Sequence, residues 1–155
     1  MKGRGYLEIE SLGTLEVIEE KDGISSVIFV DEKAEEIVSK EVTKCIEQLK
    51  EYFAKKRKTF DVKLDISCAT EFQRAAWKAL MEIPYGETRS YQAQAEMIKN
   101  PKAVRAIGGA NHRNPISIII PCHRVIGKNK KLVGYGGGLF RKEYLLNLEK
   151  AEYRR

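Results

Sequence analysis

Three consecutive residues, Cys122, His123 and Arg124, place a thiol, an imidazole and a guanidinium side by side in the chain. A thiol attacks carbon as its thiolate, and positive charge from a nearby His or Arg lowers its pKa from about 8.5 toward neutrality. Cys122 is therefore a candidate nucleophile. The alternative is a buried structural cysteine beside a salt-bridged arginine, which is the commoner role of an arbitrary Cys-His pair.

The residues before Cys122 indicate how the thiol is held. Residues 116–120 are short, apolar and rich in β-branched side chains, which predicts a strand, and Pro121 should end it and leave Cys122 at its edge. In an extended chain Cys122 and His123 point to opposite sides, so their side chains cannot share a direct hydrogen bond. A proton relay between them requires a bridging water or a sharp turn.

The elements of the first half of the chain follow from its periodicity. Residues 7–10 and 14–18 alternate, residues 21–23 form a turn signal and residues 24–30 are β-branched, which predicts a hairpin or meander. Apolar residues at intervals of three and four predict an amphipathic helix over roughly 34–56. Cys45 lies on its apolar stripe, where core packing is favoured over a role as a second nucleophile. Residues 57–69 are interpreted as a linker.

The second half carries clear helix signals. Thr70 and Gln73 form a capping-box pattern that predicts a helix from residue 70, with a stop at Pro84-Tyr85-Gly86. Thr88 or Ser90 can cap a second helix that runs to about Ile98.

Asn100-Pro101 supplies a cap and a first-turn proline for a third helix over about 102–112. The second and third helices, both short and joined by a tight turn, predict a helix-turn-helix. Residues 140–149 predict a final helix after a glycine-rich loop, 134–138, that could act as a wing.

Charge is distributed unevenly along the chain. Residues 1–70 carry 12 Lys and Arg against 15 Asp and Glu, whereas residues 71–155 carry 16 against 7, a net charge of +9. Confined positive charge is typical of a surface that binds a polyanion, and it supplies the sequence-independent part of DNA affinity. A merely solubilising charge would explain the total of +6 but not this partition.

The predicted helix over 102–112 has a surface suited to DNA. Arg105 shares a face with Gly108 and Gly109, three and four residues later. Each interior glycine costs roughly 1 kcal/mol relative to alanine, which suggests that another backbone or DNA approaches closely. A face of small residues suits the minor groove and predicts poor sequence selectivity. The alternative for Arg105 is a surface salt bridge, and His112 and Arg113 are expected to touch phosphate or water.

Composition limits the class of protein. At 155 residues the chain can bury a core without disulfide or metal staples. Three cysteines without a Cys-x-x-Cys pair, and no signal-peptide pattern after Met1, predict a reducing compartment, cytoplasmic or, in a eukaryote, nuclear. No apolar run approaches the ~20 residues that span a bilayer, so no membrane partner is expected. With only two histidines, no zinc site is expected either.

Ordered sequence blocks over residues 70–149 form a pattern that is far more specific than Pro-Cys-His-Arg alone. The blocks are Glu71-Phe72-Gln73, Trp77, Ile83-Pro84-Tyr85-Gly86-Glu87-Thr88, Ser90-Tyr91, Arg105-Ala106-Ile107-Gly108-Gly109-Ala110, Asn114-Pro115, Pro121-Cys122-His123-Arg124-Val125, Gly134-Tyr135-Gly136-Gly137-Gly138 and Lys142-Glu143-Tyr144-Leu145-Leu146. In this order, the blocks resemble the signature of the O6-alkylguanine-DNA alkyltransferases.

The resemblance implies a fold and an activity. Residues 1–69 would form a small α/β domain, ribonuclease H-like, with a linker, and residues 70–155 a winged helix-turn-helix-type domain that binds DNA and carries the catalytic cysteine. The protein would be a methylated-DNA–protein-cysteine S-methyltransferase that moves an alkyl group from guanine O6 to Cys122 once, after base flipping, as a monomer without cofactor or metal. O4-alkylthymine remains open as a second substrate.

The resemblance also assigns residue roles. Cys122 would be the nucleophile, activated through water by His123, with Glu143 orienting the imidazole and Asn114 supporting the turn. Arg124 would tie the loop down. Tyr91 would crowd the target phosphate and donate to the guanine, although without the family a core aromatic is an equal reading. Arg105 would fill the gap left by the flipped nucleotide.

Two further sets of residues complete the expected site. The DNA-binding set is Ser90, Tyr91, Arg105, Ala106, Gly108, Gly109 and Arg113. The substrate-binding set is Tyr91, Cys122, Val125, Tyr135, Gly136 and Gly137, and the backbone N–H of Gly136 would donate to O6.

Departures from the family pattern and competing functions remain. Gly136-Gly137 stands where many members have Ser-Gly. Ser117 stands where a proline is frequent, and this exchange affects the expected tolerance of bulky, benzyl-type substrates. A non-catalytic alkyltransferase-like damage sensor is the main alternative, although such proteins replace the cysteine that this chain retains. A transcriptional regulator would leave the Cys-His-Glu set unexplained, and a cysteine hydrolase would turn over repeatedly.

Overall fold

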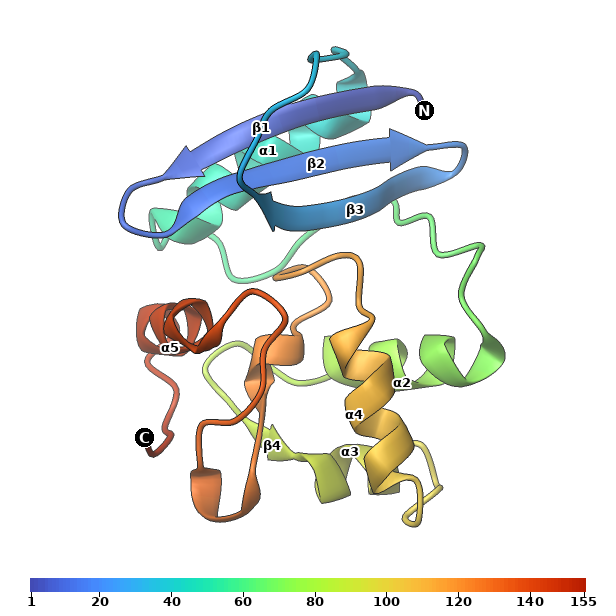
Figure 1. The fold of residues 1–155 in the computed structure, drawn as a ribbon, viewed down its shortest axis with the longest axis vertical. Helices are drawn as coiled ribbons and strands as arrows, with labels where there is room; N and C mark the ends of the chain where they lie inside the picture. The colour runs from blue at the N-terminus through green and yellow to red at the C-terminus, as the bar shows by residue number, and fades with distance from the viewer. The chain divides into compact units, whose positions relative to one another are not determined.

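The structure is a computed structural model that describes residues 1–155, and it divides into two units (Figure 1). Unit 1 comprises Met1–Ser67 together with Pro115–Ser117, and unit 2 comprises Cys68–Asn114 and Ile118–Arg155. The division falls two residues before the predicted boundary at 69/70. The assignment of Pro115–Ser117 to unit 1 is not visible in the sequence, because it rests on backbone hydrogen bonds between Pro115 or Ser117 and Val27.

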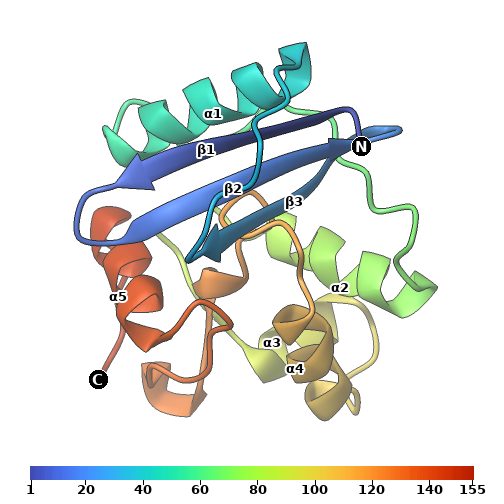
Figure 2. The same cartoon turned by 45° about the horizontal axis from the view of Figure 1, so that its top comes forward.

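Unit 1 is built on an antiparallel meander. Strands β1 (Gly3–Ile9), β2 (Gly13–Glu20) and β3 (Gly23–Val30) pair in the order β1-β2-β3. Alternate residues of these strands point into the core, as expected for a sheet covered on one face. The helix α1 (Lys40–Phe53) lies along one face of the sheet (Figure 2). The buried residues at this contact include Leu15, Val17, Val27, Val42, Cys45, Leu49 and Tyr52.

Helix α1 is shorter than the predicted span of 34–56. Ser39 caps it by accepting a hydrogen bond from the Val42 N–H at 3.2 Å. Ile37, just before the cap, instead exchanges two backbone hydrogen bonds of 2.9 Å with Arg4 at the edge of β1. The strand edge therefore competes successfully for the residues before Ser39, and Val38, which fits the helical spacing, is 86% exposed.

Unit 2 begins with the predicted capping box. The Gln73 N–H donates to the Thr70 hydroxyl at 3.1 Å, and the Thr70 N–H donates to the Gln73 side chain at 3.0 Å, at the start of α2 (Glu71–Met81). Helix α3 (Tyr91–Met97) is capped by Ser90, whose hydroxyl accepts from the Ala93 N–H. Helices α3 and α4 (Val104–His112) form the expected pair.

The predicted start of the third helix is wrong. Asn100 is not its cap: α4 begins at Val104, and Ala103 precedes it without a side-chain cap. The Asn100 N–H donates to the Ala95 carbonyl and the Asn100 carbonyl accepts from Ala103. Residues 100–103 therefore close the end of α3 with a turn before α4 begins.

A buried polar network joins three of the helices of unit 2, α2, α3 and α4. Gln94 and Asn111 exchange two side-chain hydrogen bonds of 2.9 and 2.7 Å, and Gln94 also donates to the Ala76 carbonyl. The Trp77 indole N–H donates to the Ala110 carbonyl at 2.9 Å. Because buried polar groups are costly when unpaired, these bonds fix the angles at which α2, α3 and α4 meet.

The predicted strand over 116–120 is also wrong. Ile116 makes a single bridge to Val27, and the backbone then turns, with φ of 74° at Ile118. Ile116, Ile118 and Ile120 are nevertheless almost fully buried. Burial alone accounts for the apolar run, because a buried turn needs the same side chains as a buried strand.

The remaining elements follow this turn. A 3₁₀ helix, η1 (Cys122–Arg124), leads into β5 (Val125–Ile126), which pairs in parallel with β4 (Arg89–Ser90) just before α3. A second 3₁₀ helix, η2 (Lys128–Lys130), and the loop 131–138 precede α5 (Leu139–Leu148). None of the helices is long and apolar enough to cross a bilayer.

Candidate active site

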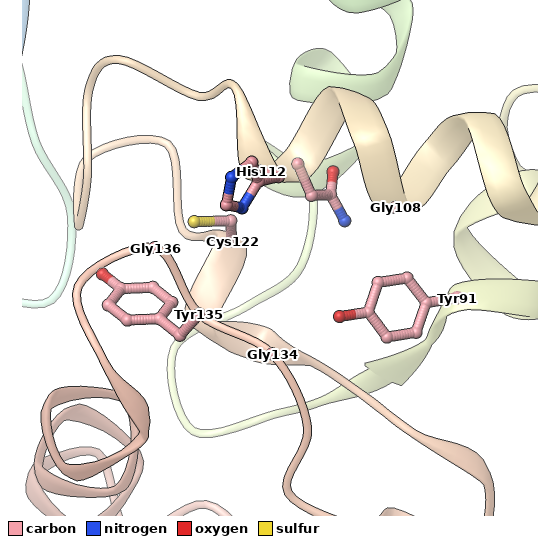
Figure 3. A pocket seen from close by; sticks show the side chains of 8 residues that line it. Tyr91, Gly108, His112, Cys122, Gly134, Tyr135 and Gly136 are labelled. Carbon is pink, nitrogen blue, oxygen red and sulfur yellow. The ribbon is translucent and has the colours of Figure 1, made fainter.

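Cys122 is the first residue of η1, and it lines a cavity of about 120 Å³ in unit 2 (Figure 3). The Cys122 N–H donates to the Ile120 carbonyl at 2.8 Å, and the Arg124 N–H donates to the Pro121 carbonyl at 3.0 Å. These bonds supply the sharp turn that the adjacent Cys and His require. The cavity is lined by Tyr91, Gly108, Asn111, His112, Cys122, Gly134, Tyr135 and Gly136.

Two polar groups oppose the effect of burial on the thiol. Burial is the largest influence and raises the pKa of Cys122 overall, while a hydrogen bond from the Asn114 side chain and the positive charge of Lys142 lower it in part. Asn114 also donates to the Ile120 carbonyl at 2.7 Å, so it supports the turn, as predicted, and in addition bonds to the sulfur. The cation that acts on the thiol belongs to Lys142, not to the adjacent His123 or Arg124.

His123 is fully buried against Glu149. Its Nε2 lies 2.7 Å from a Glu149 carboxylate oxygen, and neither side chain is exposed. Burial raises the pKa of Glu149, but the hydrogen bonds and charges of His123 and Arg124 outweigh it and hold that pKa well below its usual range. Burial also lowers the pKa of His123. A neutral imidazole that donates from Nε2 to a carboxylate leaves Nδ1 as an acceptor, and this Nδ1 has no hydrogen-bond partner within the protein.

The predicted role of Glu143 is wrong. Its carboxylate accepts from Arg155 at 2.6 Å on the outside of α5, whereas Glu149 at the end of α5 contacts His123. Glu149 follows Leu145 by four residues and Lys142 by seven, so all three share the buried face of the helix. That periodicity is the signal in the sequence that identifies Glu149.

Arg124 holds the base of the site together, as predicted. Its guanidinium donates to both oxygens of Glu149, at 2.9 and 3.1 Å, and to the Ile83 carbonyl at 2.7 Å. The Glu149 carboxylate therefore orients two residues of η1 at once. A bidentate pair of this kind fixes geometry as well as charge.

Lys142 is a functional candidate that the sequence reasoning missed. Its side chain is fully buried, and its ammonium group donates to the carbonyls of Val125, Val133 and Gly134. Burial lowers the pKa of Lys142 to about 8, although the charge of Cys122 raises it. Lys142 belongs to one of the sequence blocks that resemble the family signature, but its role was not identified there. The carbonyls that it contacts lie on separate segments, which only the fold brings together.

Tyr91 brings a second polar group to the cavity. Its hydroxyl points into the cavity from the first turn of α3 (Figure 3). Burial raises the pKa of the Tyr91 phenol, and the charge of Cys122 raises it further, so the hydroxyl stays protonated and can donate. This position favours the site role for Tyr91 over simple core packing.

The structure separates the predicted substrate-binding residues into two groups. Tyr91, Cys122, Tyr135 and Gly136 line the cavity, together with Gly108, Asn111, His112 and Gly134, which were not assigned to substrate. Val125 and Gly137 do not line it. Val125 is fully buried, and Gly137 has a packing reason, because a Cβ there would lie 2.9 Å from the Tyr135 ring.

Five of the predicted DNA-binding residues lie on α4 or directly after it, whereas Ser90 and Tyr91 lie at the start of α3. Arg105, Ala106, Gly109 and Arg113 line an open groove of about 620 Å³ with Lys102, and a Cβ at Gly108 would meet nothing within 4 Å. The hydroxyl of Ser90 caps α3. Arg105 is exposed and forms no ion pair, which removes the surface salt bridge as its explanation.

Both units match described protein families. Residues 5–66 match the ribonuclease-like domain of 6-O-methylguanine DNA methyltransferase, and residues 71–151 match its DNA binding domain. The chain belongs to this family. The fold expected from the sequence, a ribonuclease-like α/β domain followed by a helix-turn-helix-type domain, is thereby confirmed. The family fits the cavity, because a half-buried thiol, followed in η1 by an imidazole that is paired with a carboxylate, lies in the DNA-binding part.

Individual relatives agree. A methylated-DNA–protein-cysteine methyltransferase of Methanosarcina mazei is 64% identical over 102 residues, which are 66% of this chain and 64% of the relative. The match to curated relatives of this kind thus spans slightly less than two thirds of their length. The crystal structure of a Mycobacterium tuberculosis O6-methylguanine methyltransferase has a TM-score of 0.84 and 42% identity over 95% of this chain and 92% of that one. A structure of Mycobacterium tuberculosis OGT in complex with DNA is equally similar, with a TM-score of 0.84.

Proposed function

We propose that this protein repairs DNA by transferring an alkyl group from O6 of guanine to Cys122, irreversibly and once per molecule. The observation that carries the proposal is the cavity that Cys122 and Tyr91 both line, together with the fully buried His123–Glu149 pair that begins at the residue after Cys122. The relatives named as methylated-DNA–protein-cysteine methyltransferases support the same activity.

Activation of the thiol uses the free nitrogen of His123. The thiol proton passes through one water to Nδ1, and the resulting imidazolium is stabilised by its contact with Glu149. A neutral histidine with a depressed pKa suits this role, because it is ready to accept a proton at neutral pH. Glu149 holds the ring and its tautomer and keeps its own negative charge.

The transfer step breaks the bond between guanine O6 and the alkyl carbon. The sulfur electron pair forms the new carbon–sulfur bond, and the electrons of the broken bond move to the guanine. The Tyr91 hydroxyl, held protonated, hydrogen-bonds to the leaving base and so stabilises its developing negative charge. The product is a thioether, a poor leaving group, and the site holds no second thiol that could displace it. Each molecule should therefore react once.

Access to O6 requires DNA with a flipped base. The target atom lies inside the stacked duplex, and extrusion costs a few kcal/mol, less for a lesion that pairs badly. Helix α4 places Arg105 and Gly109 along the open groove beside the positive charges of Lys102 and Arg113, while Gly108 on the same helix lines the cavity. We propose that α4 enters the minor groove with Arg105 holding the flipped state, and that one protein molecule suffices.

An intact-mass measurement tests the proposal. Protein incubated with excess O6-methylguanine oligonucleotide should gain one methyl group, located on Cys122, with a burst of repair equal to the protein concentration. Cys122→Ala should bind DNA but transfer nothing. Turnover beyond one equivalent would exclude the suicide reaction and favour a hydrolase. Binding without any mass gain would favour the damage sensor.

A further inference from the structure

Asn111 is the most deeply buried of the residues that line the cavity. It is 8% exposed, whereas the other residues of the lining are half-buried or exposed. It lies near the end of α4, three residues after Gly108, which also lines the cavity. Its backbone carbonyl accepts from the Asn114 N–H at 3.2 Å, and the Asn114 side chain in turn bonds to the Cys122 sulfur. The backbone of Asn111 is thus tied to the residue that supports the nucleophile.

A buried glutamine of α3 fixes the orientation of the Asn111 amide. Gln94 is 0% exposed, and its Nε2 donates to the Ala76 carbonyl at 3.1 Å and to Asn111 Oδ1 at 2.9 Å. Because the Ala76 carbonyl can only accept, the amide nitrogen of Gln94 must face it, and Gln94 Oε1 then accepts from Asn111 Nδ2 at 2.7 Å. Both hydrogens of the Gln94 amide are used, so the Asn111 amide is held in one orientation.

One N–H of the Asn111 side chain has no acceptor within the protein. An amide nitrogen carries two hydrogens, and only one of those on Asn111 Nδ2 has a partner, the Oε1 of Gln94. A buried donor without an acceptor is costly, so this N–H is suited to an acceptor that enters the cavity. Two apolar side chains of similar shape would be nearly as stable as the amide pair. Stability alone therefore does not account for the pair.

O6-alkylguanine offers acceptors that match this donor. Alkylation at O6 removes the hydrogen of N1, so that N1, N3 and N7 of the flipped base all accept hydrogen bonds. The departing guanine takes the electrons of the broken bond, and an N–H directed at a ring nitrogen stabilises that charge as it develops. Tyr91 brings one donor to the cavity from α3, and Asn111 brings a second from α4.

We propose that Asn111 donates a hydrogen bond to a ring nitrogen of the flipped O6-alkylguanine and that Gln94 is the positioning residue that orients its amide. Gln94 follows Tyr91 by three residues, so the two share a face of α3. The amide pair therefore holds both donors in one arrangement across α3 and α4. Asn111 acts as a donor only, and no proton or electron pair passes through it. This inference rests on the proposed alkyl transfer.

The first test separates function from stability. Gln94→Met/Asn111→Leu replaces both amides by apolar side chains of similar size and should keep a Tm close to that of the parent protein. Single-turnover transfer from an O6-methylguanine oligonucleotide should slow by about tenfold or more. Affinity for undamaged duplex and alkylation of Cys122 by iodoacetamide should not change. Parental transfer by the double variant would overturn the proposal.

The matched control for this test is Gln92→Leu, which changes an exposed glutamine of the same helix. It should transfer at the parental rate. A slowing equal to that of the double variant would show that any change to α3 disturbs the site, which would also overturn the proposal.

The second test identifies the acceptor on the base. Analogues of O6-methylguanine in which carbon replaces N1, N3 or N7 each lack one acceptor. The ratio of parent to double-variant transfer rates should fall to about one for one analogue and stay at about tenfold or more for the other two. An unchanged ratio for all three would refute the hydrogen bond. Gln94→Met alone should show its smallest ratio with the same analogue, and equal ratios would leave Gln94 a purely structural role.

A third measurement needs no change to the amide pair and covers a double variant that does not fold. Nitrogen-15 NMR of Cys122→Ala, free and bound to duplex that contains O6-methylguanine, reports on the Asn111 side-chain amide. One of its two hydrogen signals should shift to lower field, while those of Gln94, whose partners are unchanged, stay in place. An unshifted Asn111 signal would overturn the proposal. Failure of the parent protein to gain a methyl group would instead count against the proposed function.

Discussion

Glu143 and Glu149 lie on the same helix, and only one of them is part of the candidate site. Glu143 is partly exposed and pairs with Arg155 near the end of the chain, where the surrounding water competes for both charges. Glu149 is fully buried and contacts His123 and Arg124, which lie on the turn that carries the nucleophile. The difference shows that the role of a carboxylate here is set by the helix face on which it lies, not by its proximity in sequence to a motif.

The largest expected effect comes from neutralising these two carboxylates in turn. Glu149→Gln leaves the Arg124 guanidinium buried without a counter-charge, and breaking such a pair costs about 3–5 kcal/mol in the free energy of unfolding. Methyl transfer should also slow by about tenfold or more, because His123 loses the group that orients it. Glu143→Gln should cost about 0–1 kcal/mol and leave transfer unchanged.

Urea unfolding and single-turnover transfer measured on both variants test this contrast. Equal losses of transfer rate in Glu143→Gln and Glu149→Gln would contradict the assignment of the carboxylate. A loss of stability in Glu149→Gln with normal transfer would limit Glu149 to holding the fold.

The pH dependence of the free energy of unfolding gives a further test of the buried Glu149 and its partner His123. The folded-state pKa of Glu149 lies below its unfolded value, so the stability it supplies is present above about pH 4.5 and is lost as pH falls toward the folded pKa. The folded-state pKa of His123 is also lowered, so the unfolded chain binds a proton first and stability already declines as pH falls below about 6.5.

The free energy of unfolding of the parent protein should therefore decrease in two stages between neutral and acid pH. Glu149→Gln should lose the stage below pH 4.5. A parent profile that is flat between pH 7 and 5 would show that His123 is not buried in its neutral form.

The same contrast between buried and exposed positions applies to two glutamines of α3. Gln94 is fully buried and bonds to Asn111 and Ala76, whereas Gln92 is exposed and bonds to Glu96 and the Pro101 carbonyl. Gln94→Ala leaves the Asn111 amide unpaired in the core, which costs about 1–3 kcal/mol. Gln92→Ala should stay within about 0.5 kcal/mol. Thermal unfolding of the two variants tests this difference. Equal shifts in Tm would show that the hydrogen bonds of Gln94 contribute little to the free energy of unfolding.

The sequence predicts the parts of this fold that depend on neighbouring residues. Thr70 and Gln73 lie within one helical turn of each other, so their capping box is readable in the sequence, and Ser90 is likewise a local cap. The prediction of a strand over 116–120 was wrong because a local run of apolar residues indicates that the segment is buried but does not determine the conformation of its backbone. The predicted start of α1 was wrong because the backbone of Ile37 forms its hydrogen bonds with Arg4, which lies more than thirty residues away in the sequence.

The candidate site divides in the same way. Cys122 and His123 were identified from a compact motif and Asn114 from the family resemblance, and Glu149 could have been identified from the buried face of its helix. The role of Lys142 could not, because Val125, Val133 and Gly134 reach its ammonium group only after the loop folds back on α5. Residues that act through distant carbonyls leave no pattern in the sequence.

Arg105 should show the smallest effect on stability and a selective effect on function. It is exposed on α4 and forms no ion pair, so Arg105→Ala should change the free energy of unfolding by no more than about 0.5 kcal/mol. Its proposed work is to hold the flipped state of the duplex, so the variant should lose repair of duplex DNA far more than reaction with free O6-alkylguanine. Lys78→Ala, which removes an exposed charge from α2, is the control for lost charge alone. Repair rates on both substrates, measured at two salt concentrations, separate these effects, since loss of a phosphate contact would also reduce the salt dependence of binding. Equal losses on the duplex and the free base would assign Arg105 a structural role and leave the small residues of α4, Gly108 and Gly109, as the remaining reason to place that helix in the groove.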